Sequence, residues 1–167
     1  DGNPGLVVIG LCCVTLGSIL YRSLESGITP MPSSGRVRRA LESLLDELPA
    51  TGAMAELGSG WGTVARQLAR RRPRAWVVGF ETSPLPYLFS RLRPCANLKF
   101  VRADFFKRDL GCFGLIYCYL CPALMERLAA KFERELEPGS IVVSNSFALR
   151  GWRPVRVVEL NDLYRSR

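Results

Sequence analysis

The 167-residue sequence contains no histidine. This absence excludes from the chain alone a Ser-His-Asp triad, a Cys-His pair and any metal site that uses imidazole ligands. Lysine is scarce too, because only Lys99, Lys107 and Lys131 accompany a large number of arginines. The net charge of +8 suits RNA, an anionic membrane surface or an acidic partner, although a compositional bias toward arginine over the whole chain would give the same surplus.

Paired cysteine motifs are nearly absent. Of the six cysteines, only Cys118 and Cys121 have C-x-x-C spacing, and a structural zinc site needs a second such pair. We interpret both as small apolar residues at the end of a buried strand rather than as redox groups or metal ligands. The sequence therefore predicts no metal site and a reducing compartment.

One apolar run lies near the amino terminus. Residues 6–21, LVVIGLCCVTLGSILY, carry no charge, but the run is shorter than the roughly 20 residues that an untilted helix needs to cross a bilayer. Basic residues follow it, which would place the rest of the chain on the cytoplasmic side. Two interpretations stay open: a membrane-associated protein anchored through this run, or a soluble cytoplasmic protein in which the run packs on the core.

A loop and a helix follow the apolar run. Pro30 and Pro32 favour an extended loop, and Ser33 or Ser34 can cap a helix whose apolar residues repeat at spacings of three and four. We therefore divide the chain into an N-terminal apolar segment at 1–26, a loop and helix at 27–52, and a core at 53–167.

Strand-like and helix-like stretches alternate from residue 53 onward. This alternation predicts an α/β fold with a Rossmann-like, doubly wound and mostly parallel sheet covered by helices. Near the end, residues 154–167 predict a sixth strand, a turn at Asn161 and Asp162, and only the start of a seventh strand, so the last edge strand is expected to be truncated. The expected strands are 53–57, 75–80, 97–101, 112–120 and 140–147, and the expected helices are 61–71, 84–92 and 123–136.

A glycine-rich turn follows the first of these strands, in the stretch ELGSGWG at 56–62. A dinucleotide-binding turn needs G-x-G-x-x-G, but Thr63 occupies the third glycine position, and no Gly-Lys-Ser/Thr is present for a phosphate-binding P-loop. The pattern E-x-G-x-G-x-G is followed by a second acid, Glu81, at the end of the next strand. Together they resemble motif I and the following acid of the class I S-adenosylmethionine-dependent methyltransferases.

This resemblance implies S-adenosyl-L-methionine as the cofactor. The three glycines lack Cβ and would permit close backbone approach, while Glu56 would attract the ammonium group of the ligand directly or through water. Glu81 would accept hydrogen bonds from the ribose diol, and Asp104 would meet the adenine amino group beside an apolar wall from Phe105. The predicted cofactor-binding residues are Glu56, Gly58, Ser59, Gly60, Gly62, Glu81, Thr82, Asp104 and Phe105.

A second stretch of sequence points to one group within the class I methyltransferases. The stretch TPMPSSGRVRRALESLL at 29–45 is similar to the proline-and-serine/threonine segment of the small membrane-anchored protein-lysine methyltransferases, whose mitochondrial members modify the ADP/ATP carrier and the c-subunit of ATP synthase. That family also begins with an apolar segment, and its fourth strand ends in a proline, like IYCYLCP at 116–122. The similarity extends from about residue 6 to Trp152 and implies a protein substrate, including membrane proteins.

One departure concerns the end of the fourth strand. The Asn/Asp-Pro-Pro-Tyr/Phe motif of many amino and amide N-methyltransferases is replaced by YLCP at 119–122, which disfavours methylation of nucleic-acid bases. A lysine nucleophile must arrive neutral, so a nearby group has to take or orient its proton. The candidate catalytic residues are Tyr119, Ser33 and Ser34, each with a structural alternative: aromatic packing for the tyrosine and helix capping for the serines.

Three functions therefore stay open from the sequence. The first is a membrane-associated protein-lysine methyltransferase. The second is an RNA or small-molecule methyltransferase, for which the arginine surplus would supply a binding surface. The third is a cofactor-binding protein that has lost catalysis and acts as an interaction module. The retained Glu56, Glu81 and Asp104 argue against the third, because a decayed site need not keep its acids.

Overall fold

The computed structural model describes residues 3–10, 17, 33–49 and 52–160. The chain forms two compact units, Asp1–Pro32 and Ser33–Arg167. In the first unit, residues 4–10 are helical, and most of the apolar run 6–21 lies outside the described residues. No helix within the described ranges is long and apolar enough to cross a membrane.

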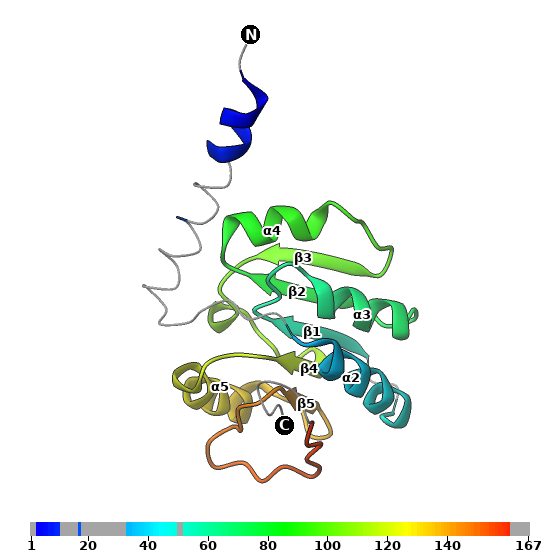
Figure 1. Ribbon diagram of the computed structural model, residues 1–167. Helices are drawn as coiled ribbons and strands as arrows, with labels where there is room; N and C mark the ends of the chain where they lie inside the picture. Colours follow the sequence, from blue (N-terminus) through cyan, green and yellow to red (C-terminus); the bar gives the residue numbers. More distant parts are fainter. Residues whose placement is uncertain (1–2, 11–16, 18–32, 50–51, 161–167) are drawn as a thin grey trace. The chain divides into compact units, whose positions relative to one another are not determined.

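Five parallel strands form the sheet of the second unit (Figure 1). Their order across the sheet is β3-β2-β1-β4-β5. Strands β2 and β3 are added on one side of β1, and β4 and β5 are added on its other side, so the order reverses between β1 and β4. Ligands of such folds bind beyond the carboxyl ends of the strands at this switch point. The predicted α/β, Rossmann-like class is therefore confirmed. The strands are β1 (Ala53–Leu57), β2 (Val77–Glu81), β3 (Leu98–Arg102), β4 (Phe113–Cys118) and β5 (Ile141–Ser144).

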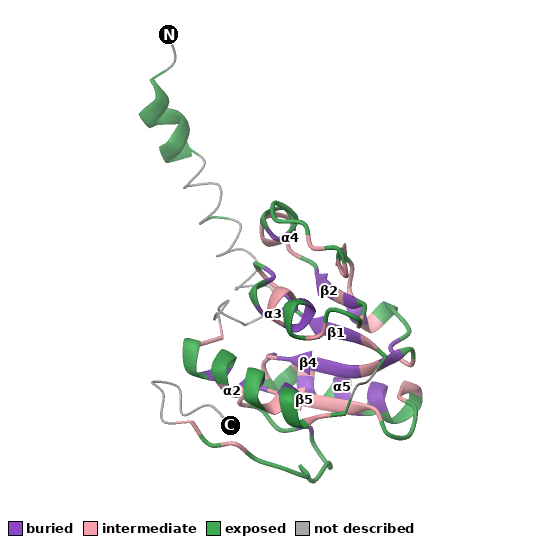
Figure 2. Cartoon of the chain, turned by 90° about the vertical axis from the view of Figure 1, so that its right-hand side faces the viewer, coloured by how far each residue is buried: buried purple, intermediate pink, exposed green. Residues whose placement is uncertain are grey.

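Helices connect and cover the strands, and Figure 2 shows buried residues concentrated in the sheet with exposed residues on the outer sides of the helices. In the helix Gly35–Glu47, Val37, Leu41 and Leu45 are buried at spacings of four, which is the stripe that the sequence predicted. Only a short 3-10 helix separates β3 from β4. The elements are α2 (Gly35–Glu47), α3 (Thr63–Arg71), α4 (Pro84–Arg91), η1 (Phe105–Lys107) and α5 (Pro122–Glu135).

Successive residues of the central strands face two different parts of the core. Met54 and Tyr117 pack with residues of α2 and α3 on one side of the sheet. Ala55 and Leu57 pack with residues of α5 on the other side. A strand buried on both faces requires this alternation, and it directs Glu56, which shares the face of Met54, toward α3.

The predicted sixth strand is wrong within the described residues, since 151–160 contain no strand. Val155 is fully exposed and Val157 is exposed as well, so the apolar positions of this stretch gain little by burial. Instead, Arg156 forms an ion pair with Glu47 of α2. A regular strand needs backbone partners along one edge, and none of the described strands pairs with this segment. The predicted turn at Asn161 and Asp162 and the start of a seventh strand lie outside the described residues.

Candidate active site

The glycine turn lies at the carboxyl end of β1, and all three of its glycines have positive φ angles: 74° at Gly58, 50° at Gly60 and 75° at Gly62. A Cβ at Gly62 would lie 2.3 Å from the ring of Phe100, so this glycine lets the turn pack on β3. A Cβ at Gly60 would meet no atom within 4 Å in the part of the chain that the structure describes. The turn is therefore packed at its end and open at its middle.

Glu81, at the end of β2, holds the middle of the turn. One of its carboxylate oxygens accepts a hydrogen bond from the backbone amide of Gly60 at 2.7 Å, and the other accepts one from the amide of Ser83, also at 2.7 Å. Each carboxylate oxygen has a second lone pair. The side chain thus fixes the turn while it retains acceptor capacity for a ligand hydroxyl.

Glu56 lies beneath the turn and is buried. Its carboxyl group accepts a hydrogen bond of 2.6 Å from the amide of Ala65 in the first turn of α3. Burial raises the pKa of Glu56 to about 8; the bond from Ala65 opposes this rise, and the charge of Glu81 adds to it. A cationic ligand group nearby would favour the ionised form.

Ser59 and Thr82 differ in their surroundings. The Ser59 hydroxyl is buried without a hydrogen-bond partner among the described residues, while its amide donates to the carbonyl of Phe80 at 2.8 Å. Thr82 is exposed, and its carbonyl accepts a bond of 3.4 Å from Arg102. Both residues adjoin a glycine or carboxylate of the site, and their contact with cofactor stays a prediction.

Asp104 follows β3 and caps η1, where its carboxylate accepts a hydrogen bond from the amide of Phe106 at 2.9 Å. Phe105 is buried in the core. The ring of Phe106 is half-buried with its centroid 4.5 Å from that of Phe105. Phe105 was predicted as a wall for adenine, and its contact with cofactor stays a prediction.

The candidate catalytic residues have separate environments. Ser34 caps α2, because its hydroxyl accepts a hydrogen bond of 3.2 Å from the amide of Val37. Tyr119 is half-buried and stacks on Phe147, with ring centroids 6.4 Å apart. The hydroxyl of Ser33 lies 3.1 Å from that of Tyr117. Ser33 is therefore linked to β4 through Tyr117.

Tyr117 is a site residue that the sequence reasoning missed. It pairs with Glu56 across β1 and β4, it is buried, and Asn145 is a second hydrogen-bonding partner. Burial raises the pKa of Tyr117 above its usual range, so its hydroxyl stays protonated at neutral pH and can only donate or accept hydrogen bonds. Its position two residues before Tyr119 was the available signal, because alternate strand residues share a face.

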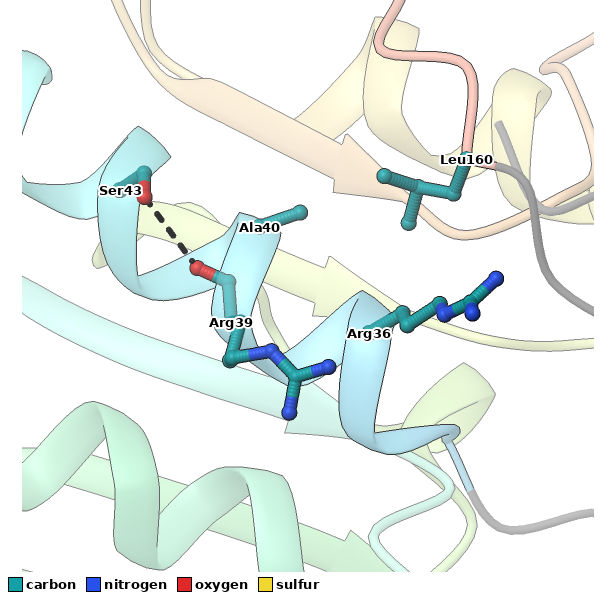
Figure 3. Close-up of a pocket in the computed structure, with 5 residues that line it drawn as sticks. All are labelled: Arg36, Arg39, Ala40, Ser43 and Leu160. Carbon is teal, nitrogen blue, oxygen red and sulfur yellow. Dashed lines mark hydrogen bonds between the residues drawn. The ribbon is translucent and has the colours of Figure 1, made fainter.

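Two surface depressions lie elsewhere. One, of about 490 Å³, lies on the outer side of α2 where the C-terminal segment approaches it; Figure 3 shows its lining residues, Arg36, Arg39, Ala40, Ser43 and Leu160. The other, of about 500 Å³, lies beside β2 and β3 and includes Trp76 and Val78. Neither contains a predicted site residue, so the carboxyl edge of the sheet stays the candidate active site.

Comparison with known protein families identifies the family to which this chain belongs. A model of the ANTKMT methyltransferase domain family matches residues 56–156, from the first acid of the glycine turn to the segment after β5. The chain belongs to this methyltransferase family. The carboxyl edge of its sheet is accordingly the part of the domain at which a ligand of this fold class binds.

Relatives of this methyltransferase include three lysine methyltransferases. A protein-lysine N-methyltransferase of Saccharolobus islandicus is 29% identical over 75% of this chain and 80% of its own length. The mouse adenine nucleotide translocase lysine N-methyltransferase is 32% identical over 77% of this chain but only 58% of its own length. The human lysine N-methyltransferase of the ATP synthase c-subunit is 26% identical over 93% of this chain and 70% of its own length.

Solved structures show the same fold. An RNA methyltransferase from Salinibacter ruber, in complex with S-adenosyl-L-homocysteine, superposes with a TM-score of 0.71 at 27% identity, covering 78% of this chain and 87% of that chain. The predicted family, fold and cofactor of this methyltransferase are thus confirmed. The turn fits such a ligand, because a Cβ at Gly60 would meet no atom of the described residues within 4 Å and Glu81 retains acceptor capacity beside it.

Proposed function

We propose that this methyltransferase transfers the methyl group of S-adenosylmethionine to lysine side chains of proteins. The observation that supports this most is the family match over 56–156, which includes the whole glycine turn and the ends of all five strands. The names of the three relatives, each a lysine N-methyltransferase, support the choice of acceptor.

We assign cofactor binding to the β1 and β2 side of the site. The backbone of Gly58, Gly60 and Gly62 would lie against the ligand, and Glu81 would accept hydrogen bonds from the ribose hydroxyls. Glu56 would balance the ammonium group through its buried carboxyl. Asp104 would approach the adenine. When bound, S-adenosylmethionine supplies a methyl group on a sulfonium that is a good leaving group.

We assign orientation of the acceptor to the β4 side. Methyl transfer needs alignment of the nucleophile in a dry pocket more than it needs a strong base. The Ser33 hydroxyl, held by Tyr117 at 3.1 Å, and the nearby end of β4 with Tyr119 supply hydroxyl groups that could orient a neutral lysine. Ser34 is the weaker candidate, because its hydroxyl already caps α2.

We further propose that the substrates include membrane proteins and that the chain associates with membranes. Two relatives are named for adenine nucleotide translocase and for the c-subunit of ATP synthase, and the uncharged run 6–21 would suit a membrane anchor. The alternative of RNA methylation is supported by the RNA methyltransferase from Salinibacter ruber with its similar fold and by the arginine surplus of the sequence.

The deciding experiment incubates the purified chain with methyl-labelled S-adenosylmethionine and a cell extract separated into membrane protein, soluble protein, RNA and small molecules. We expect label in a membrane-protein band, and hydrolysis of that protein should release the label as methyl-lysine. Glu81→Ala should abolish this label, whereas Glu137→Ala, which removes an exposed acid between α5 and the start of β5, should keep it. Label in RNA or small molecules alone would contradict the proposal, as would tight cofactor binding without any labelled protein.

A further inference from the structure

One apolar surface of the second unit is formed by Trp61, Leu88, Phe89 and Leu92, and we name it the α4 patch. Its side chains are 40%, 55%, 50% and 70% exposed, respectively. The ring of Trp61 meets that of Phe89 edge to face with centroids 5.3 Å apart, and the helical spacing places Leu92 on the same face as Leu88 and Phe89. Large contiguous apolar groups on a surface mark a binding site.

Arg66 holds the two parts of this patch together. Its guanidinium donates to the carbonyls of Trp61 and Gly62, each at 3.0 Å, and to the carbonyl of Ser90 in α4 at 2.5 Å. The glycine turn is thereby fixed to the helix that carries Phe89. The α4 patch is therefore a built surface rather than a set of loose side chains.

The charged residues that adjoin the patch in the sequence are basic. Between residues 57 and 103 the sequence has nine arginines and lysines but a single acid, the buried Glu81. Arg91 and Arg93 are exposed next to Leu92. Burial lowers the pKa of Arg66, and repulsion from the charges of Arg93 and Arg70 lowers it further. An anionic partner would relieve this repulsion.

We propose that the α4 patch, with Arg91 and Arg93, binds the surface of an anionic lipid bilayer. Aromatic and leucine side chains bordered by arginine are the composition of segments that insert into the interface of a membrane and attract its acidic headgroups. RNA is the less suitable partner, because two of the four patch residues, Leu88 and Leu92, are leucines that offer no ring for base stacking.

This contact would differ from the proposed anchor at 6–21 and does not depend on which substrate is methylated. Trp61 stands between Gly60 and Gly62, so a bilayer that takes up the Trp61 ring would lie beside the cofactor turn. An enzyme oriented in this way would present its active site to acceptors close to the membrane surface.

The test uses the full chain, its three tryptophans and vesicles that carry brominated acyl chains, which quench tryptophan fluorescence only inside the bilayer. Trp76 and Trp152 are 48% and 37% exposed, similar to the 40% of Trp61, and serve as matched controls. With vesicles containing about one-third phosphatidylglycerol, we expect quenching that Trp61→Phe removes and that Trp76→Phe and Trp152→Phe retain.

A second variant separates the patch from the anchor. Leu88→Ser combined with Leu92→Ser should weaken vesicle binding at least about tenfold, because two leucines no longer enter the interface, and neutral vesicles should bind poorly. Unchanged melting temperature would verify folding. Vesicle binding without quenching of Trp61, or with full affinity in the double variant, would overturn the proposal, and so would RNA binding that depends on the patch when vesicles are not bound.

Discussion

The two sides of the carboxyl edge of the sheet are built in different ways. Over β1 and β2, carboxylates hold backbone amides: Glu81 binds the amide of Gly60, and Glu56 binds that of Ala65. Over β4, hydroxyl groups meet, and Ser33 contacts Tyr117 across 84 positions of sequence. The first side is a local motif in which a backbone is shaped for a ligand. The second is an assembly of distant side chains, which suits the orientation of a variable acceptor.

The largest effect should come from the packed end of the glycine turn. Gly62→Ala forces a Cβ to within 2.3 Å of Phe100 at a φ of 75°. We expect the free energy of unfolding to fall by about 2–5 kcal/mol, from the left-handed backbone and the overpacking together. Urea unfolding followed by circular dichroism measures this loss.

Gly60→Ala is the matched control, because its φ is also positive but its Cβ would meet no atom within 4 Å. This substitution should lower the free energy of unfolding by only about 1–2 kcal/mol. Its loss in the free energy of cofactor binding should be larger. Equal destabilisation by both substitutions would mean that contact with β3 does not shape the turn.

The next effect concerns pH and Glu56. Burial raises the pKa of this group from 4.5 to about 8, so between these values the folded chain keeps a proton that the unfolded chain has lost. The free energy of unfolding should therefore fall as the pH rises from about 5 to about 8, by up to about 4 kcal/mol. Denaturation at several pH values should show a flatter profile for Glu56→Gln, and an identical slope in both proteins would contradict this account.

Glu81→Gln should have a smaller effect, on binding more than on folding. The amide oxygen can still accept one backbone bond, but the charge-assisted acceptor beside Gly60 is lost, which costs about 1.5–3 kcal/mol or roughly 10- to 100-fold in cofactor affinity. Titration calorimetry with S-adenosylhomocysteine measures it. Unchanged affinity would remove Glu81 from the cofactor site, with Glu137→Gln as the control for a change of surface charge.

The smallest losses of stability are expected on the β4 side of the site, at Ser33 and Tyr117. Ser33→Ala removes the hydrogen bond to Tyr117 and should lose about 0.5–1.5 kcal/mol, whereas Tyr117→Phe also removes the hydrogen bond with Asn145 and should lose more; the double variant should lose less than the sum. Ser34→Ala should also lose about 1 kcal/mol as a missing helix cap but should leave kcat unchanged. If Ser33→Ala likewise keeps kcat, the pair is structural and the comparison between the two sides loses its functional meaning.

The sequence predicted the elements of the fold closely but failed where burial decides. The strand at 53–57 was placed without error, and the helix beginning after Ser34 follows its apolar spacing. The alternating pattern at 154–160 predicted a strand that does not form there, because alternation indicates a strand only when one face is buried, and Val155 is fully exposed.

The candidate site was also predictable in part. Glu56, the glycines and Glu81 lie within 26 positions of one another, and the strand-turn-helix that they form brings them together by local geometry. Tyr117 was missed because its one signal in the sequence, the alternate spacing from Tyr119, does not show which residue it faces, and its register opposite Glu56 places it at the edge.

By itself, the sequence determined the class of the protein: spaced glycines and an acid at or near the end of each early strand are the pattern of a turn that lies against a cofactor. Tertiary structure decided the rest. It brought Ser33 to Tyr117, left 151–160 without a strand, and set Trp61 against Phe89 through Arg66. The physical reason is that these contacts join residues far apart in the chain, and their free energy exists only after the parallel sheet has formed.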